Sequence, residues 1–239
     1  MKKSLLSLLS LFVVILGFIA CNEDDTVDYS DYYEWKNQNN DVMLRMHDYQ
    51  KRLGQNAYFT DTIVSQAEPL SFRCLYRVIT PANEDSLRAI NKWYTPYYTS
   101  TLKMHYTLYD PKSVMSKLPA DEASFNNPEI MDKIFFDSEN KADTLESQQV
   151  TFFEDFTCAS VIVGWAEILQ HMHIGDNWLV AIPWYLAYGQ AGNSTIDPYS
   201  NLYFRMELVD IGSAVLHPGS QSAKRQGSLS AVEGSGTQR

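Results

Sequence analysis

Aromatic side chains are the residues of this sequence whose positions best suit a chemical role. Val161-Ile162-Val163-Gly164-Trp165 ends an extended apolar run, and a helical run from Ala166 to Met172 follows directly. A glycine and a tryptophan at that junction put a large flat ring at the start of a helix, beneath whatever the neighbouring strands enclose. The stretch therefore predicts the apolar floor of a cup-shaped site.

The usual catalytic groups are arranged less favourably. His171 and His173 alternate at a helix end, but a metal ion would need further ligands that cannot be placed nearby, so no metal site is predicted. Asp137 and Glu154 could act as an acid and a base, although a lone Asp beside aromatic residues fits hydrogen bonding better. No Ser-His-Asp order, Gly-rich phosphate loop or Cys-His pair is found.

The elements that must carry these residues follow from periodicity. Apolar residues alternate with other residues in four runs, which predict strands at 72–79, 102–110, 178–182 and 202–209. The long polar stretches at 111–133, which holds three prolines, and at 139–149 predict loops, with one helical turn near 128–133. Strands without βαβ alternation imply the α+β class, an antiparallel sheet with a helix packed on one face.

An amphipathic helix is predicted at 31–53, where Trp35, Val42, Met46 and Tyr49 recur at near-helical spacing before Gly54. Its polar face is mixed in sign, which favours packing on the neighbouring domain or on a second copy of the chain over packing on lipid. An aromatic cluster at 93–98 is either a platform for a sugar or peptide, or a loop that packs on the core, which is the commoner case.

Composition sets the broad class of the protein. The chain has 239 residues, of which 45% are hydrophobic and 13% aromatic, enough for one or two modest domains with a buried core. The formal charge of −10 and the pI near 4.9 argue against a nucleic-acid partner, which needs a clustered positive surface.

The first residues indicate export. Lys2 and Lys3 precede the apolar run Leu5–Ala20, which is too short to span a membrane and predicts a signal peptide. Phe18-Ile19-Ala20-Cys21 resembles a bacterial lipobox, which makes Cys21 the lipidation site; a plain secretory signal with an incidental cysteine is the alternative. The acidic stretch 22–25 resembles the surface-export tag of some Bacteroidetes lipoproteins, or is simply a solvated tether.

Two further cysteines, Cys74 and Cys158, form an even pair in an oxidising compartment, which permits a disulfide. Both lie in apolar, strand-like runs, where a free cysteine is more often a small core residue. The sequence leaves the two alternatives open.

Six short motifs, in order between Leu102 and Ile211, resemble those of the FKBP-type peptidyl-prolyl cis-trans isomerases, over a little under half the chain. The first three are Met104-His105-Tyr106-Thr107 for a V-H-Y-T strand, Phe136-Asp137-Ser138 for an F-D-S turn and Val161-Ile162-Val163-Gly164-Trp165 for the V-I-x-G-W floor. The others are Met172-His173-Ile174-Gly175-Asp176 for M-x-V-G-D, Ile182-Pro183 with Leu186-Ala187-Tyr188-Gly189 for I-P-x-x-L-A-Y-G, and Ile196-Asp197-Pro198 through Leu202-Tyr203-Phe204 for the I-P-P to L-x-F ending. Each motif alone is weak, whereas six in the family's order are specific.

The resemblance implies an antiparallel half-barrel wrapped around a short α-helix, to which the helix predicted from periodicity adds an N-terminal extension. The predicted domain layout is a signal peptide at 1–20, an acidic tether at 21–30, the extension at 31–70, an FKBP-like domain at 71–211 with an insertion at 111–133, and a disordered tail at 212–239, which is rich in Gly, Ser and Gln. The implied catalytic residues are Tyr106, Phe136, Asp137, Trp165, Tyr188 and Phe204, and the implied substrate-binding residues are Phe152, Val161, Ile162 and Ile196.

The implied chemistry needs no cofactor, metal or nucleophile. Rotation about an X-Pro amide is slow because it breaks resonance, with a barrier of about 18–20 kcal/mol. Twisting reduces the charge separation of the amide, so a water-poor aromatic pocket favours the twisted form over the planar one. The Tyr188 hydroxyl and the Ile162 backbone N–H would hold substrate carbonyls, and Asp137 with Tyr106 would order the polar rim.

Three departures from the family pattern stand out. Asn193 stands in the loop from Tyr188 to Ile196, where family members vary, which should affect which peptides bind more than whether catalysis occurs. The aromatic residue expected two positions after Phe152 falls on Glu154, with Phe153 or Phe156 available after a shift of the alignment. The insertion at 111–133 replaces a short connection and is expected at the pocket rim, as a flap that grips substrate or as an obstruction.

The sequence therefore predicts a peptidyl-prolyl cis-trans isomerase that acts on proline-containing segments of exported proteins. A lipid at the N-terminus would anchor it to the outer membrane of a bacterial cell envelope, facing the periplasm or the outside. The alternative is a non-catalytic FKBP-like lipoprotein that binds peptides or proteins, and a homodimer through the N-terminal helix is a further possibility.

Overall fold

The structure is a computed structural model that describes residues 30–64, 73–150 and 161–212. The predicted signal peptide, Cys21, all but the last residue of the acidic tether, Phe152, Cys158 and all but the first residue of the predicted tail lie outside the described residues. Among the described residues, no helix combines the length and apolarity that a membrane crossing needs.

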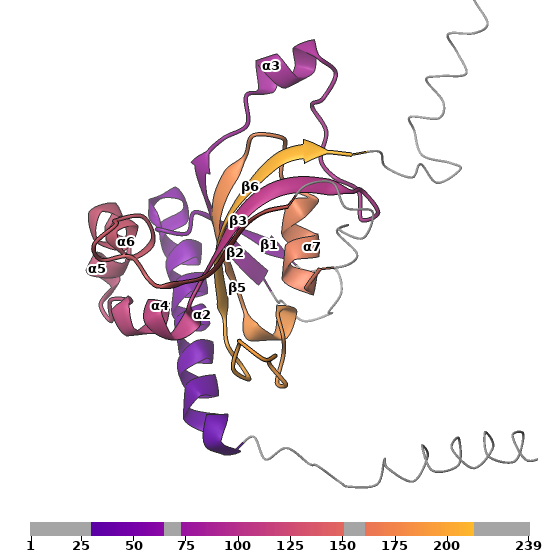
Figure 1. Cartoon of the computed structure of the whole chain (residues 1–239). Coiled ribbons are helices and arrows are strands. Elements are labelled where there is room, and N and C mark those ends of the chain that lie inside the picture. Colours follow the sequence, from indigo (N-terminus) through magenta and orange to yellow (C-terminus); the bar gives the residue numbers. More distant parts are fainter. Residues whose placement is uncertain (1–29, 65–72, 151–160, 213–239) are drawn as a thin grey trace, which may run out of the picture. The chain divides into compact units, whose positions relative to one another are not determined.

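The described strands form one antiparallel sheet, in the order β1-β2-β5-β6-β3-β4 (Figure 1). Their bounds are β1 Asp61–Val64, β2 Arg73–Thr80, β3 Leu102–Tyr109, β4 Thr144–Val150, β5 Asn177–Ile182 and β6 Leu202–Ile211. The helices are α2 Tyr33–Leu53, α3 Glu84–Ala89, α4 Pro111–Lys117, α5 Glu122–Phe125, α6 Pro128–Phe135 and α7 Val163–Leu169. The α+β class predicted from the sequence is confirmed.

Both faces of the sheet are covered, because successive side chains of a strand point to opposite sides. On the central strand β5, Trp178, Val180 and Ile182 belong to the apolar cluster that contains α7. Leu179 and Ala181 belong to a second cluster, which contains α2 and the helices α4 and α6. Figure 1 shows α7 on one side of the sheet and α2 with α4–α6 on the other. A strand buried on both faces explains why every residue of β5 is buried.

The N-terminal helix packs on the domain of its own chain. Val42, Met43, Met46 and Tyr49 of α2 are buried in the second cluster, together with Leu75 of β2 and other sheet residues. Of the two expectations for this helix, packing on the neighbouring domain is therefore what the structure shows. The same extension also contributes β1, which pairs with β2, so the sheet begins before the predicted boundary at residue 71.

The insertion is helical, which corrects the predicted loop at 111–133. Asp110, Asp121 and Asn127 precede α4, α5 and α6, and each side chain accepts a backbone N–H of the first helical turn. Pro111 and Pro128 occupy the first turns of α4 and α6, where a proline is favoured because that N–H has no helical partner. Two of the three prolines interpreted as loop signals are therefore helix starts, and the third, Pro119, follows the end of α4.

The predicted polar connection at 139–149 is also wrong, because β4 occupies most of it and pairs with β3 at the sheet edge. Helix α7 begins at Val163, three residues before the predicted start, so Trp165 lies inside its first turn. Cys74 on β2 is a buried free thiol, and burial raises its pKa. It is a core residue rather than a reactive one.

Candidate active site

A pocket of about 250 Å³ opens between the sheet and α7. Pockets for drug-sized molecules span roughly 300–1,000 Å³, so this volume suits a group the size of a small ring. The residues that line it are Tyr106, Leu108, Glu146, Val161, Ile162, Trp165, Tyr188 and Phe204. Six of these residues were predicted from the sequence as site residues, and the structure brings those six together.

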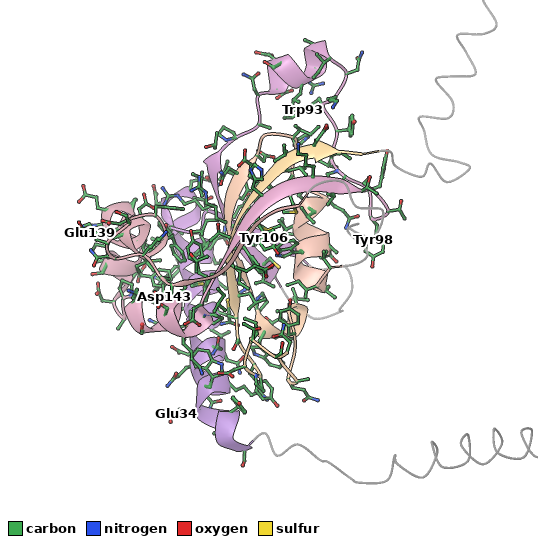
Figure 2. All side chains as sticks on the ribbon, viewed as in Figure 1. Glu34, Trp93, Tyr98, Tyr106, Glu139 and Asp143 are labelled. Atoms are coloured by element: carbon green, nitrogen blue, oxygen red, sulfur yellow. The ribbon has the colours of Figure 1, made fainter. Side chains whose placement is uncertain are left out.

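Three aromatic rings enclose the base of the pocket. The Tyr106 ring meets the Trp165 ring edge to face, with centroids 4.9 Å apart and an interplanar angle of 80°. Phe204 meets Trp165 in the same manner at 5.0 Å and 72°. Trp165 is 5% exposed and Phe204 4%, so the base is apolar and nearly dry. Figure 2 shows Tyr106 between the sheet and α7.

Trp165 reaches this position because α7 packs closely on the sheet. A Cβ atom at Gly164 would overlap Cγ2 of Ile182 and lie 3.2 Å from the Leu186 carbonyl oxygen. Only glycine lets the first turn of α7 approach β5 this closely. The glycine of the Val161–Trp165 stretch therefore determines how deep the indole sits.

The polar rim is built on Tyr106 and Glu146. The Tyr106 hydroxyl donates to Oε1 of Glu146, with the two oxygens 2.5 Å apart. Burial, followed by this hydrogen bond, raises the pKa of Tyr106, so the phenol stays protonated and keeps donating. Glu146 is on β4, where it pairs with Leu108 and lies diagonally across from Tyr106.

Tyr188 completes the rim from the loop between β5 and β6, and its side chain is 40% exposed. Further along this loop, Asn193 Oδ1 accepts the N–H groups of Thr195 and Ile196 at 2.8 and 2.7 Å. Ile196 is 3% exposed and packs in the same apolar cluster as Trp165, which places it behind the pocket surface. Asn193 stands where members of the family vary, and here it holds the turn that buries Ile196.

Comparison with known proteins identifies the family. The model of the FKBP-type peptidyl-prolyl cis-trans isomerase family matches residues 129–209. FK506-binding protein 2 of Debaryomyces hansenii is 32% identical over 109 residues, which are 45% of this chain and 76% of that protein. The chain belongs to the FKBP family.

Other FKBP-related proteins match over shorter segments. The macrophage infectivity potentiator of Trypanosoma cruzi is 52% identical over 52 residues, which are 21% of this chain and 26% of that protein. The chain thus spans about a quarter of the length of this relative. The crystal structure of a peptidyl-prolyl cis-trans isomerase from Pseudomonas syringae pv. tomato aligns with a TM-score of 0.42 at 20% identity, covering 74% of this chain and 96% of that one.

Two predicted site residues, Phe136 and Asp137, lie away from the pocket. Their assignment to the F-D-S turn of the family is therefore corrected. Phe136 packs against the second apolar cluster and lies under the guanidinium of Arg205, 5.6 Å from its ring centroid. Asp137 Oδ1 accepts the N–H of Glu139 at 2.9 Å. The triplet Leu145-Glu146-Ser147 repeats the apolar, acidic and serine pattern of Phe136-Asp137-Ser138, and it is the copy that β4 brings to Tyr106.

The insertion does not lie over the pocket. Its residues Val114, Phe125 and Met131, and Ile134 and Phe135 directly after it, are buried in the cluster on the α2 side of the sheet. The expected flap or obstruction at the rim is therefore absent from the described residues of 111–133. These helices build the core behind the sheet instead.

The aromatic segment 93–98 divides between packing and exposure. The Trp93 ring stacks on His173, with centroids 3.7 Å apart at 12°. Tyr97 and Tyr98 are more than half exposed, and Tyr98 lines a separate cavity beside α7 together with His171. No group of three or more His, Cys, Asp or Glu residues suited to a metal ion occurs in the described part of the chain.

Proposed function

We propose that this chain is a peptidyl-prolyl cis-trans isomerase that acts on X-Pro bonds of exported polypeptides. The observation that carries the proposal is the apolar base of the pocket, in which Tyr106 and Phe204 stand edge-on to the buried Trp165 ring. A substrate proline ring would lie on Trp165, with the amide bond between the aromatic walls. Membership of the FKBP family supports the same chemistry.

The pocket would lower the barrier to rotation about the X-Pro amide by surrounding the amide with apolar side chains. The planar amide carries more charge separation than the twisted one, so a water-poor aromatic site destabilises the planar form relative to the twisted form. The Tyr188 hydroxyl and the Ile162 backbone N–H would each donate to a substrate carbonyl. Glu146 would hold the Tyr106 hydroxyl, so that the phenol ring keeps its edge toward Trp165.

The decisive experiment measures isomerisation of a proline-containing peptide by the chain that begins after Cys21. We expect faster exchange between the cis and trans peptide signals, and a loss of that acceleration in Tyr188→Ala. Tyr94→Ala is the matched control, because Tyr94 is 41% exposed and lines none of the described pockets near Trp165. If the peptide binds without any acceleration, the non-catalytic binding lipoprotein is the correct function.

We also propose export and lipid anchoring in a bacterial cell envelope, with Cys21 carrying the lipid. The positive n-region, the apolar run Leu5–Ala20 and the small residue before Cys21 support this. Expressed in a bacterium with labelled palmitate, the chain should incorporate label and sediment with membranes, whereas Cys21→Ser should do neither. Equal labelling of both chains would refute the assignment of Cys21.

A homodimer through α2 is a weaker proposal, because the apolar side of this helix is already buried in its own chain. The dimer would have to use the outer side, on which Leu44 is 69% exposed. Sedimentation should then show a dimer that Leu44→Asp converts to a monomer.

A further inference from the structure

The loop that carries Tyr188 is bonded to α2 by a buried pair of asparagines. We define the Tyr188 loop as residues 183–201, between β5 and β6. Asn39 of α2 is completely buried, and its Oδ1 accepts the backbone N–H of Asn201 at 2.8 Å. The backbone carbonyl of Asn39 accepts a second hydrogen bond, from Nδ2 of Asn201, at 2.7 Å. The two residues are 162 positions apart in the chain, so the contact joins α2 to the last residue of the loop.

The same pair also reaches the first residues of the loop. Oδ1 of Asn201 accepts the backbone N–H of Trp184 at 3.1 Å. Trp184 enters the loop and Asn201 leaves it, so the pair holds both ends at one point on α2. Buried amide groups are normally hydrogen-bonded, and here the amide groups of Asn39, Asn201 and Trp184 are hydrogen-bonded to one another.

Further contacts come from the same face of the helix. Trp35 Nε1 donates to the Ser200 hydroxyl at 3.0 Å, and Trp184 Nε1 donates to Oδ1 of Asn40 at 2.8 Å. The Lys36 ammonium lies 4.7 Å from the ring centroid of Tyr199. Residues 35, 36, 39 and 40 recur at the spacing of one helix face, so α2 presents this face to the loop.

The middle of the loop is bonded to itself and is also held by the core, because Leu186 and Ile196 are buried in the α7 cluster and Asp197 forms an ion pair with Lys112 of α4. The Tyr199 N–H donates to the Gly189 carbonyl at 3.0 Å, and the Gly189 N–H donates to the Trp184 carbonyl at 2.9 Å. Tyr199 has a φ of 60°, a conformation that is unfavourable for a residue with a side chain and that persists only where contacts hold it. Lys36 and Trp184 pack on its ring.

We infer that α2 positions the Tyr188 loop at the pocket, and that Asn39 is the positioning residue. The inference deepens the proposed function and rests on it for the effect on catalysis. A loop held in place before substrate arrives does not lose its freedom on binding, so Tyr188 can meet a substrate carbonyl at lower entropic cost. The N-terminal extension would thus be part of the catalytic unit without touching the substrate.

The test uses the full-length chain in mild detergent and compares Asn39→Ala with Met46→Ala. Met46 is 1% exposed on the same helix, but it packs in the second apolar cluster, whose members include no residue of the Tyr188 loop. We expect Asn39→Ala to speed amide hydrogen exchange at Trp184 and Asn201 by about tenfold or more, because it opens the loop locally. Met46→Ala should lower the melting temperature of the whole chain without this selective change.

Kinetics give a second readout. In Asn39→Ala we expect KM for a proline-containing peptide to rise by about fivefold with a smaller change in kcat, because the loop is less ordered before binding. Met46→Ala should keep both constants at temperatures where it is folded. If Asn39→Ala fails to fold, Trp35→Phe removes one hydrogen bond to the loop and keeps the ring, and it should shift exchange and KM in the same direction.

The outcomes separate this inference from the proposed function. Selective exchange in the loop, with a wild-type chain that does not isomerise peptides, would refute the isomerase and leave the positioning role standing. An active wild-type chain in which Asn39→Ala and Met46→Ala change exchange and KM alike would overturn the positioning role and leave the isomerase standing.

Discussion

At the scale of single residues, the site depends on which acidic side chain meets Tyr106. The Tyr106 hydroxyl donates a hydrogen bond to the Glu146 carboxylate, with the two oxygens 2.5 Å apart, while Asp137 caps a turn elsewhere in the chain. Hydrogen bonds to charged acceptors are stronger than those between neutral groups. The orientation of one pocket wall thus depends on a residue of the edge strand β4.

The two acidic residues provide a matched pair of variants. Glu146→Ala should lower kcat/KM by about tenfold, because a hydrogen bond to a charged group contributes about 1.5 kcal/mol or more and each 1.4 kcal/mol is about a factor of ten. Asp137→Ala should change it by about twofold or less, as is typical of partly exposed positions away from a site. Peptide isomerisation assays on both variants check this, and a larger loss in Asp137→Ala would restore the original alignment.

The sequence placed most of the pocket correctly, and the error has a physical origin. Tyr106, Trp165, Tyr188 and Phe204 lie in or beside elements with clear periodicity, so their motifs aligned without gaps. The F-D-S pattern occurs at Phe136, where it ends α6, and again in weaker form at Leu145. Only the pairing of β4 with β3 decides between the two copies, and β4 is a polar edge strand without apolar alternation.

At the scale of elements, most strands were predicted from alternation, whereas α4 and α5 were missed and α6 was predicted only as one helical turn near 128–133. The relevant signal was present as Asp110-Pro111 and Asn127-Pro128, a capping residue followed by a proline in the first helical turn. The same dipeptides also begin turns, so composition alone does not distinguish the two. The buried side of α6, with Met131, Ile134 and Phe135, is what makes the helix stable in this chain.

The contact of α7 with β5 is sensitive to one methyl group. Gly164→Ala should lower the free energy of unfolding by roughly 1–3 kcal/mol, because the new Cβ overlaps Ile182 in a packed core. In the Ile182→Ala background the same change should cost less, since the overlapping atom is gone. Urea unfolding of the four chains measures the coupling, and strictly additive losses would show that the close approach is not what requires glycine.

The contact of α2 with β2 should depend on pH through His47. Burial, reinforced by the positive charge of Arg73, lowers the pKa of His47 to about 4. In the unfolded chain His47 takes up a proton below about pH 6.5, whereas in the folded chain it stays neutral until about pH 4. The free energy of unfolding therefore falls as pH drops from 6.5 toward 4.

His47→Gln removes the titrating imidazole and should flatten that part of the curve of unfolding free energy against pH. The pH-dependent loss should shrink by up to about 2 kcal/mol once the partial exposure of His47 is allowed for. Unfolding free energies at pH 7.5 and 4.5 for both chains provide the measurement. An equal loss in wild type and His47→Gln would assign the pH dependence to other groups.

At the scale of the whole molecule, the sheet separates a functional face from a structural one. The pocket and α7 lie on one face, while α2 and the inserted helices fill the other. The Tyr188 loop contacts both groups of elements, since it carries a pocket residue and bonds to α2. The additions to the FKBP fold in this chain therefore lie behind the sheet, and α2 reaches the pocket through this loop.

This arrangement predicts that the insertion is required for folding. Replacing 111–143 by a short linker removes several fully buried side chains, each of which contributes about 1.5–3 kcal/mol, against a total stability of about 5–15 kcal/mol for a domain. We expect this variant to lose cooperative unfolding and its near-UV circular dichroism. The matched control replaces 84–91, whose helix α3 buries only Leu87, and should remain folded.

Two outcomes would contradict this prediction. A folded 111–143 variant with faster isomerisation would identify the insertion as an obstruction. A folded 111–143 variant that is active on peptides but no longer binds proteins would identify the insertion as a flap.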